Sequence, residues 1–483
     1  MNLLHLLENY FHGLLEHWTD DPDPYVAMIK AAQDPRHGDY QANFAMPLAK
    51  KLGKNPRELA EEIVDRVHWN QVIAKLDIAG PGFINFHFRT DWLAVQVQEM
   101  ARGGRLGVPE AAPPLTYVVD YSSPNVAKPL HVGHLRSTII GDCLARLLRF
   151  LGHRVITDNH LGDWGTQFGI LLFGYKHYLD SDAFQNDPVR ELTRLYIHVR
   201  NLMKVREDEE TEDHSNAIAE AVRQETAKLH AGDPENVRLW QMFLPWGRQE
   251  IDRIYQRLDV HFDYTQGESF YQSLLAEVVR SLVENGIARH GTDGAIIIGS
   301  EESPALIRKK DGAFTYTTSD LATICHRVEQ FRPDAILYVV GTPQALHFKT
   351  LFDSARRWGY DKVDLEHIAF GSVLGPDRRP LKTREGGAVE LGQLLDEAVQ
   401  RGEKVYEQSL ADRIALGRPV PPLSPEDRRN IAEVVGIGAV KYADLAQNRT
   451  SDYVFNWEKM LATDGNTATY MQYAYVRNRG IFR

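Results

Sequence analysis

The apolar positions between residues 116 and 157 predict a strand, a helix and a second strand in succession. Residues 117–119 (Tyr-Val-Val) form a short aromatic and β-branched run, which is typical of a buried strand. After Gly133, apolar residues recur every three or four positions, which predicts one buried helix face. They are Leu135, Ile139, Ile140, Cys143, Leu144, Leu147, Leu148 and Leu151. Gly152 ends this pattern and residues 155–157 supply the next apolar run, so we predict a parallel βαβ unit.

Residues 1–110 have the pattern of a separate first domain. Leucines and aromatics at helical spacing follow the N-terminus, and the alternating string GPGFINFHF predicts a strand. Asn55, Pro56 and Glu58 form a helix start with a cap, a first-turn proline and an acidic residue that reaches back. The boundary falls in the glycine- and proline-rich residues 103–114. Four cations near that helix start either contact phosphates or form a solvated basic face: Lys50, Lys51, Lys54 and Arg57.

Residues 115–387 are predicted to form the main α/β domain. Two more apolar runs, residues 295–300 and 335–341, are typical of buried parallel strands. Helical periodicity dominates residues 181–295, which predicts a helical insertion within this domain. The same periodicity continues through residues 388–483, which we predict to be a helical C-terminal region.

Composition narrows the class of protein without assigning a function. A chain of 483 residues is too long for one core and predicts about three domains. The net charge of −11 gives no support for nucleic-acid binding, so any such surface must be a local basic patch. The only two cysteines, Cys143 and Cys325, exclude a cysteine-rich zinc site and indicate a reducing compartment. The sequence contains no signal peptide or long apolar run, so we predict a cytoplasmic protein.

Two histidines open the predicted helix of the βαβ unit. His131 and His134 flank Val132-Gly133 at the point where a helix presents unpaired N–H groups and a positive dipole end. Such a helix start suits phosphate, and the imidazoles can donate hydrogen bonds to phosphate oxygens as negative charge builds up. Gly133 leaves bare backbone against which a purine can lie. The tetrapeptide alone fits two solvated or core histidines equally well, and only the strand–loop–helix setting favours a nucleotide site.

Two longer strings connect this setting to a known family. DYSSPNVAKPLHVGHLRSTIIGD, followed by NHLGDWGTQFG from residue 159, resembles the class I aminoacyl-tRNA synthetases and, within them, the arginyl group. The resemblance implies a Rossmann-like α/β catalytic domain in which His131, Gly133 and His134 bind ATP and both histidines act in catalysis. It also implies that residues 1–110 are an α+β additional domain that contacts the outer corner of tRNA.

Tyr316 and Asp320 are the candidate residues for recognising an amino-acid side chain. Lying four positions apart on the opening turn of a predicted helix, they share one face and offer a carboxylate and a π surface, which suits a guanidinium. By spacing alone they are more often an exposed helix pair, but the family resemblance implies that YTTSD grips arginine. It further implies that Asp120, Ser123, Asn125 and Gln344 line the amino-acid site, with Asn125 and Gln344 at the α-amino and carboxylate end. For His347 we favour core packing over support of Gln344.

A glycine-rich basic loop, residues 371–387, occupies the place of the second class I signature, K-M-S-K-S. It departs from that signature because Pro380 stands in place of the first lysine, while Lys382, Thr383 and Arg384 keep the late cations. Such a loop can close over the phosphates of ATP, with Lys382 and Arg384 catalytic and Lys382 and Thr383 binding ATP, or it can be a plain surface loop. Some arginyl enzymes that lack the first lysine carry one before the histidine motif, and Lys128 fits that role.

The resemblance implies that this chain is an ATP-dependent ligase that joins L-arginine to tRNA(Arg) through an arginyl-adenylate. It implies that tRNA is needed before the adenylate forms and that Mg²⁺ arrives with ATP, so we expect no protein-bound metal site. We expect a monomer that ends just inside a helical anticodon-binding domain. Two alternatives stay open: another nucleotidyltransferase that shares H-x-G-H, and a tRNA-binding paralogue without catalysis.

Overall fold

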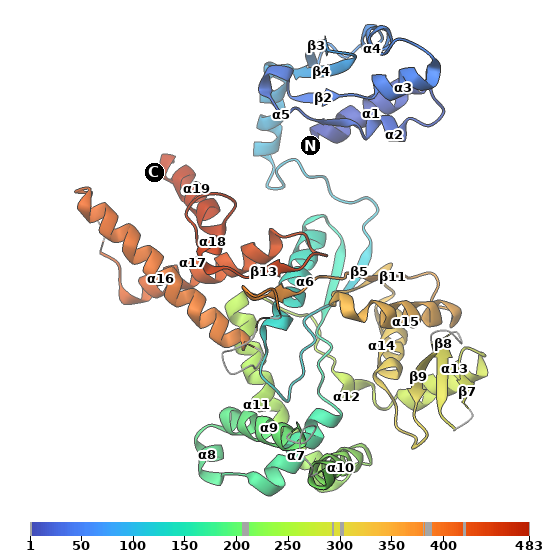
Figure 1. Cartoon of the computed structure of the whole chain (residues 1–483), viewed down its shortest axis with the longest axis vertical. Helices are drawn as coiled ribbons and strands as arrows, with labels where there is room; N and C mark the ends of the chain where they lie inside the picture. The colour runs from blue at the N-terminus through green and yellow to red at the C-terminus, as the bar shows by residue number, and fades with distance from the viewer. Residues whose placement is uncertain are drawn as a thin grey trace. The chain divides into compact units, whose positions relative to one another are not determined.

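The computed structural model describes residues 2–204, 212–291, 294–299, 304–379, 381, 389–418 and 422–482 (Figure 1). Contacts between residues divide the chain into two compact units, Met1–Glu110 and Ala111–Arg483. Each unit has a hydrophobic core of its own. In the described part of the chain no helix is long and apolar enough to cross a membrane.

The first unit packs helices on an antiparallel sheet. Its strands run in the order β1 (Ile29–Ala31), β2 (Tyr40–Ala42), β4 (Phe83–Phe88), β3 (Ile73–Ala79). The helices are α1 (Leu3–Leu15), α2 (Asp23–Val26), α3 (Ala45–Leu52), α4 (Pro56–Asp65) and α5 (Thr90–Arg102), with a 3₁₀ turn, η1 (Pro35–His37). Asn55 caps α4 with its side chain, which confirms the predicted helix start.

Three of the four cations near that helix start interact within the unit. Lys54 pairs with Glu62 at 2.7 Å, Lys51 donates to the Thr19 hydroxyl, and Arg57 donates to a backbone carbonyl. Lys50 is exposed. Their contact with tRNA phosphates stays a prediction.

A four-stranded parallel sheet organises the second unit. The order is β11 (Asp364–His367), β10 (Ala335–Tyr338), β5 (Thr116–Asp120), β6 (Arg154–Asp158), and every neighbouring pair is parallel. Helix α6 (Val132–Phe150) connects β5 to β6, which confirms the predicted βαβ unit. Val118 and Val119 contribute to two different cores, because successive side chains of a strand point to opposite faces of the sheet. The sheet is therefore covered on both faces, as a parallel sheet requires.

The buried stripe of α6 is shorter than its sequence pattern predicts. Leu147 lies in that pattern, yet half of its surface is exposed. The 19 residues of α6 extend about 28 Å, whereas the five-residue strands β5 and β6 extend about 17 Å. The helix is therefore longer than the two strands that it connects.

A long connection between β6 and β10 contains the helical insertion and a second small sheet. The helices are α7 (Thr166–Tyr178), α8 (Ser181–Asn186), α9 (Pro188–Lys204), α10 (Glu212–His230), α11 (Pro234–Leu258), α12 (Glu268–Tyr271), α13 (Leu275–Glu284) and α14 (Tyr316–Phe331). The small sheet contains β7 (Arg289–His290), β8 (Ile296–Gly299) and β9 (Pro304–Arg308), and it is antiparallel. The predicted parallel strand at residues 295–300 is therefore wrong, since a short apolar run shows burial but not strand direction.

The C-terminal region is helical and contributes one strand to a separate two-stranded sheet. After η2 (Thr342–Gln344), α15 (Ala345–Arg357) and β11, strand β12 (Val373–Leu374) pairs in parallel with β13 (Tyr453–Val454). The helices are α16 (Leu391–Ala415), α17 (Pro425–Leu445), α18 (Trp457–Met460) and α19 (Ala468–Ile481). Arg136 of α6 anchors this region, because it pairs with the buried Asp444 of α17 at 2.9 Å and donates to the carbonyls of Gly371 and Ser451.

The strand order creates a natural ligand site. The chain leaves β5 toward β6 on one side and returns to β10 on the other side, so the connections diverge above the carboxyl ends of β5 and β10. Crevices at such a switch point are the usual binding sites of open parallel sheets.

Candidate active site

The two histidines of the sequence motif cap helix α6 through their Nδ1 atoms. The backbone N–H of Gly133 donates to His131 Nδ1, and the backbone N–H of His131 donates to His134 Nδ1, each at 3.1 Å. A neutral imidazole carries one proton, so a ring that accepts at Nδ1 carries its proton on Nε2. Both Nε2–H groups are therefore donors at the start of a 19-residue helix. Their ring centroids lie 4.0 Å apart.

Burial keeps both imidazoles neutral. It lowers the pKa of His134 to about 3, with smaller contributions from the neighbouring His131 and Lys128. Burial, followed by Lys128, also lowers the pKa of His131. The histidines are therefore uncharged hydrogen-bond donors, and the positive potential at this position comes from the helix dipole and Lys128.

Position 133 requires glycine for a steric reason that the sequence does not show. A Cβ at this position would lie 2.8 Å from the ring of His131, which is closer than real Cβ contacts. The glycine is thus required for the His131 ring to fold back over the helix start. Its predicted contact with a purine stays a prediction.

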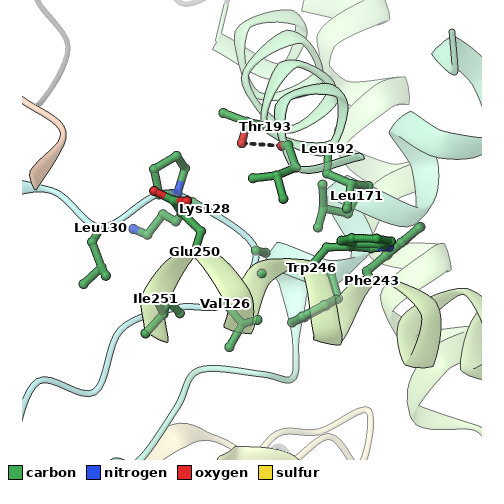
Figure 2. A pocket seen from close by; sticks show the side chains of 15 residues that line it. Val126, Lys128, Leu130, Leu171, Leu192, Thr193, Phe243, Trp246, Glu250 and Ile251 are labelled. Carbon is green, nitrogen blue, oxygen red and sulfur yellow. Dashed lines mark hydrogen bonds between the residues drawn. The ribbon is translucent and has the colours of Figure 1, made fainter. Parts of the chain in front are cut away.

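Lys128 lies on the loop before the histidines, at the edge of an apolar cavity of about 40 Å³. Figure 2 shows Lys128 and Glu250 at one end of this cavity and Trp246 and Phe243 at the other. Burial, followed by the charge of Arg200, lowers the pKa of Lys128. Within the part of the chain that the structure describes, no carboxylate lies within ion-pair distance of the Lys128 ammonium. The cation is held beside the helix start without a counter-ion.

The chain that follows the basic loop pairs with the histidine motif. Lys382, Thr383 and Arg384, as well as Pro380, lie outside the described residues. The segment that follows them pairs with the histidine motif, because Val132 N–H donates to the Val389 carbonyl and Leu391 N–H donates to the Leu130 carbonyl, at 2.9 and 2.8 Å. His131 and Glu390 form an antiparallel bridge between these bonds. Val389, the first described residue after Arg384, therefore lies directly next to the helix start.

Tyr316, Asp320 and Gln344 are brought together around one open cavity. Tyr316, Asp320, Val340, Gln344, His347 and Phe348 line a space of about 370 Å³. Tyr316 is 65% exposed although it begins α14, so its ring is available to a ligand. His347 differs from its predicted packing role: its Nε2 donates to Asp320 Oδ2 at 2.6 Å, and its ring meets Tyr316 edge-on. The histidine thus orients the carboxylate, and no hydrogen bond joins it to Gln344 within the described residues.

The cavity is next to the histidine helix. Ser137 of α6 donates to the carbonyl of Val339 at 2.6 Å, and the next residue, Val340, lines the cavity. Arg136 of the same helix donates a hydrogen bond to the carbonyl of Gly371. Gly371 is the residue after Phe370, which forms a parallel bridge with Gly341. The first turns of α6 and the floor of the cavity are therefore fixed to the same strand end, at the switch point of the sheet.

Glu268, at the start of α12, is a site residue that the sequence reasoning missed. Burial, together with the charges of Asp320 and Asp163, raises the pKa of this carboxyl to about 8. In the described part of the chain no cation pairs with Glu268. A partly buried acid near other carboxylates is suited to a cationic ligand.

Asp120 and Ser123 belong to a buried polar network beneath this site. The Asp120 carboxylate pairs with Arg327 at 2.7 Å and accepts from Ser123 Oγ at 2.9 Å. Arg327 is fully buried, and it also pairs with Asp158 at 2.8 Å. The predicted contact of Asp120 with the amino acid stays a prediction, because both carboxylate oxygens already have partners inside the protein.

Asn125 lies on the loop between this network and Lys128. Its Oδ1 accepts from the Ala127 N–H at 3.0 Å, and its backbone forms a parallel bridge with Gly162. The preceding turn is strained, since Ser122 and Ser123 have φ angles of 69° and 46° in the left-handed region. The Asn125 side chain is thereby fixed by the loop itself, and its nitrogen remains as a hydrogen-bond donor.

Comparisons with known proteins agree with the resemblance seen in the sequence. Residues 96–457 match the family described as tRNA synthetases class I (R), catalytic domain, and residues 3–88 match the arginyl tRNA synthetase N terminal domain. A protein of Rhodopirellula baltica named arginine–tRNA ligase is 43% identical over 100% of this chain and 83% of its own length. One of the same name from Cellvibrio japonicus is 43% identical over 96% of this chain and 78% of its own.

Solved structures of arginyl-tRNA synthetases are also similar to this chain. The arginyl-tRNA synthetase structure of Plasmodium falciparum has a TM-score of 0.75 and 28% identity, covering 99% of this chain and 80% of that chain. The structure from Thermus thermophilus also has a TM-score of 0.75, but at 22% identity it shows the fold alone. With a catalytic family match over most of its length and relatives at 43% identity, the chain belongs to the arginyl family of class I tRNA synthetases.

Proposed function

We propose that this chain attaches L-arginine to tRNA(Arg), using ATP to form an arginyl-adenylate as the intermediate. One observation carries the proposal: an aromatic ring and a carboxylate line one cavity beside a helix start that presents two neutral imidazole donors. The first group is complementary to a guanidinium, and the second is complementary to phosphate oxygens. Both lie at the carboxyl edge of one parallel sheet.

Different residues bind the two ends of the arginine. The guanidinium is planar and always charged, so it pairs with Asp320 and Glu268 while its face rests on Tyr316. His347 keeps the Asp320 carboxylate oriented. Asn125 and Gln344 hold the α-amino and carboxylate end. A neutral side chain of the same shape would not form the ion pair with Asp320, and this loss provides selectivity for charge.

In the first step a carboxylate oxygen of arginine attacks the α-phosphorus of ATP, and the bond from that phosphorus to the β-phosphate oxygen breaks. Pyrophosphate leaves with the electron pair of that bond. No side chain needs to act as a nucleophile, so the protein contributes orientation and electrostatic stabilisation. The Nε2–H groups of His131 and His134 donate to the phosphate oxygens on which charge accumulates. Lys128 supplies the positive charge, together with Lys382 and Arg384 of the basic loop, while Gly133 and Thr383 contact the nucleotide.

In the second step a ribose hydroxyl at the tRNA 3′ end attacks the carbonyl carbon of the adenylate. The bond to the AMP phosphate breaks, and the hydroxyl proton leaves with AMP. Residues 1–110 contact the outer corner of tRNA, and the helical insertion faces its acceptor end. Mg²⁺ arrives on ATP, and in the described residues no three histidine, cysteine or acidic side chains are grouped as metal ligands. We place the protein in the cytoplasm, where charged tRNA is used, and its monomeric state stays a prediction.

A charging assay tests this function. The purified chain is incubated with ATP, Mg²⁺, total tRNA and one labelled amino acid, and acid-precipitable label is measured for arginine, lysine and citrulline. We expect label from arginine only, since lysine lacks the planar fork and citrulline lacks the charge. Folded protein that binds tRNA but transfers no arginine would contradict the proposal and identify a tRNA-binding paralogue.

A further inference from the structure

The segment Leu161–Trp164 lies between the two ends of the proposed amino-acid site. On one side it pairs with the loop that carries Asn125. Val126 N–H donates to the Gly162 carbonyl and Gly162 N–H donates to the Pro124 carbonyl, each at 3.0 Å. A Cβ on Gly162 would lie 3.0 Å from Asn125 Nδ2, so backbone and side chain meet directly.

On the other side the same segment holds the turn that carries Glu268. The Asp163 carboxylate accepts from Ser269 N–H at 2.8 Å and from Ser269 Oγ at 2.7 Å. Glu268 N–H donates to the Leu161 carbonyl at 2.9 Å. Any Cβ on Gly267 would overlap the Asp163 carboxylate, so the turn lies directly against this side chain.

Helix α12 cannot hold its own position. It has four residues, which is one turn, and such a helix is unstable without outside contacts. Asp163 supplies those contacts and is itself almost completely buried. The Trp240 indole donates to the Asp163 carbonyl at 2.8 Å, and the rings of Trp164 and Trp240 meet edge-on. The segment is therefore fixed to α11 and cannot shift freely with the turn.

We propose that Leu161–Trp164 sets the distance between the α-amino end and the guanidinium end of the site, with Asp163 as the positioning residue that selects amino acids by side-chain length. The inference rests on the proposed function. Asp163 does not touch the amino acid; it acts through Ser269 on the placement of Glu268. One methylene too many or too few in a shaped pocket typically costs 10–200-fold in kcat/KM, so a fixed distance is sufficient for discrimination.

The test compares three substrates that differ only in length: L-arginine, L-homoarginine with one more methylene, and L-2-amino-4-guanidinobutanoate with one fewer. Adenylate formation is measured as amino-acid-dependent ATP–pyrophosphate exchange in the presence of tRNA. In Asp163→Ala we expect the preference for arginine over both analogues to fall at least about 10-fold, with the KM for ATP unchanged. Asp163→Asn keeps an acceptor for Ser269 N–H and a partner for Ser269 Oγ, so it should retain the preference.

Two more variants separate positioning from a general structural role. Ser269→Ala removes one of the two hydrogen bonds that Ser269 donates to the Asp163 carboxylate. The preference for arginine over its analogues should therefore fall less than it does in Asp163→Ala. Asp180→Ala removes a matched cap, since Asp180 accepts from the N–H groups of Asp182 and Ala183 at the short helix α8, and should leave the preference unchanged. Thermal unfolding of each variant reports on folding, and Ser269→Ala keeps the test valid if Asp163→Ala does not fold.

The outcomes distinguish this inference from the proposed function. Equal losses for all three amino acids in Asp163→Ala, or loss of the preference in Asp163→Asn, would overturn the role of Asp163 in length selection. Absence of exchange with any of the three amino acids in the unmodified chain would instead overturn the proposed function.

Discussion

Replacing His134 by asparagine and, separately, by glutamine separates the two roles of this imidazole. Its Nδ1 accepts the His131 N–H at the helix start, and its Nε2–H is the donor that we propose for the phosphate oxygens. Asparagine places an acceptor near the Nδ1 position and has no group at Nε2, whereas glutamine places a donor near Nε2. The first variant therefore keeps the cap and loses the donor, and the second keeps the donor and weakens the cap.

Loss of the Nε2 donor and loss of the helix cap have effects of different size. Removing one preorganised donor from a developing oxyanion typically costs about 2.7–4 kcal/mol, or 10²–10³-fold in kcat. Removing a helix cap costs about 1 kcal/mol of folding free energy. We therefore expect His134→Asn to lower kcat at least about 100-fold with an unchanged Tm. We expect His134→Gln to lower kcat much less and to unfold at a slightly lower temperature.

The assay is ATP–pyrophosphate exchange at saturating arginine and ATP, with thermal unfolding measured in parallel. A pH series from 6 to 8 adds an independent check. Because the pKa of His134 is about 3, this imidazole stays neutral throughout, and the pKa of His131 is also lowered, so kcat should not fall as the pH rises through 6.5. His134→Asn within 10-fold of the unmodified kcat, or a kcat that declines above pH 6.5 in step with imidazolium loss, would refute the reasoning.

Three further outcomes follow from the same geometry. The pKa of Glu268 is raised to about 8, so arginine binding at lower pH must first remove a proton from this carboxyl. The KM for arginine, measured by steady-state kinetics, should therefore fall as the pH rises from 6 to 8. In Glu268→Gln the KM should be higher and should not depend on pH in this way. Tyr316→Ala removes the ring face from the guanidinium and should raise the KM for arginine about 3–30-fold, corresponding to roughly 0.5–2 kcal/mol, and an unchanged KM would exclude the contact. Arg136→Met leaves the buried Asp444 carboxylate without its ion-pair partner and should lower the free energy of unfolding in urea by about 3–5 kcal/mol. The double variant Arg136→Met with Asp444→Leu should recover part of this free energy. A double variant that is less stable than the single variant would contradict the prediction.

The sequence was most informative where local pattern and local chemistry agree. The run from β5 through α6 to β6 could be predicted because burial imposes the helical and strand periods directly, and because the α6 cap uses residues only three positions apart. The grouping of Tyr316 with Asp320 follows from one helical turn. In each case the residues that matter are neighbours along the chain.

Where tertiary contacts decide, the sequence was less informative. The run at residues 295–300 is buried as predicted, but its direction depends on partners that periodicity does not identify, and β8 is antiparallel. Leu147 follows the helical pattern of α6, but half of its surface is exposed. His347 was predicted to pack in the core and instead orients Asp320, because its partner lies on another helix.

The missed site residues have the same explanation. Glu268 is defined as a site residue by burial and by its neighbours Asp163 and Asp320, which come from distant parts of the chain. Arg327 does have a signal in the sequence: it falls on the apolar stripe of α14 between Ile324 and Phe331, where a cation requires a buried acid. Which acids pair with it, Asp120 and Asp158, only the fold could show.

The central claim is that one crevice holds the guanidinium of arginine at Tyr316 and Asp320 while the histidine helix holds the phosphates of ATP. Arginine-dependent ATP–pyrophosphate exchange, with and without tRNA, tests it most directly, because exchange requires both substrates in the same site. We predict exchange that depends on arginine and on tRNA, and its loss when Asp320 is changed to Asn. Folded protein that exchanges no pyrophosphate in either condition, or exchanges it equally well without arginine, would contradict the claim.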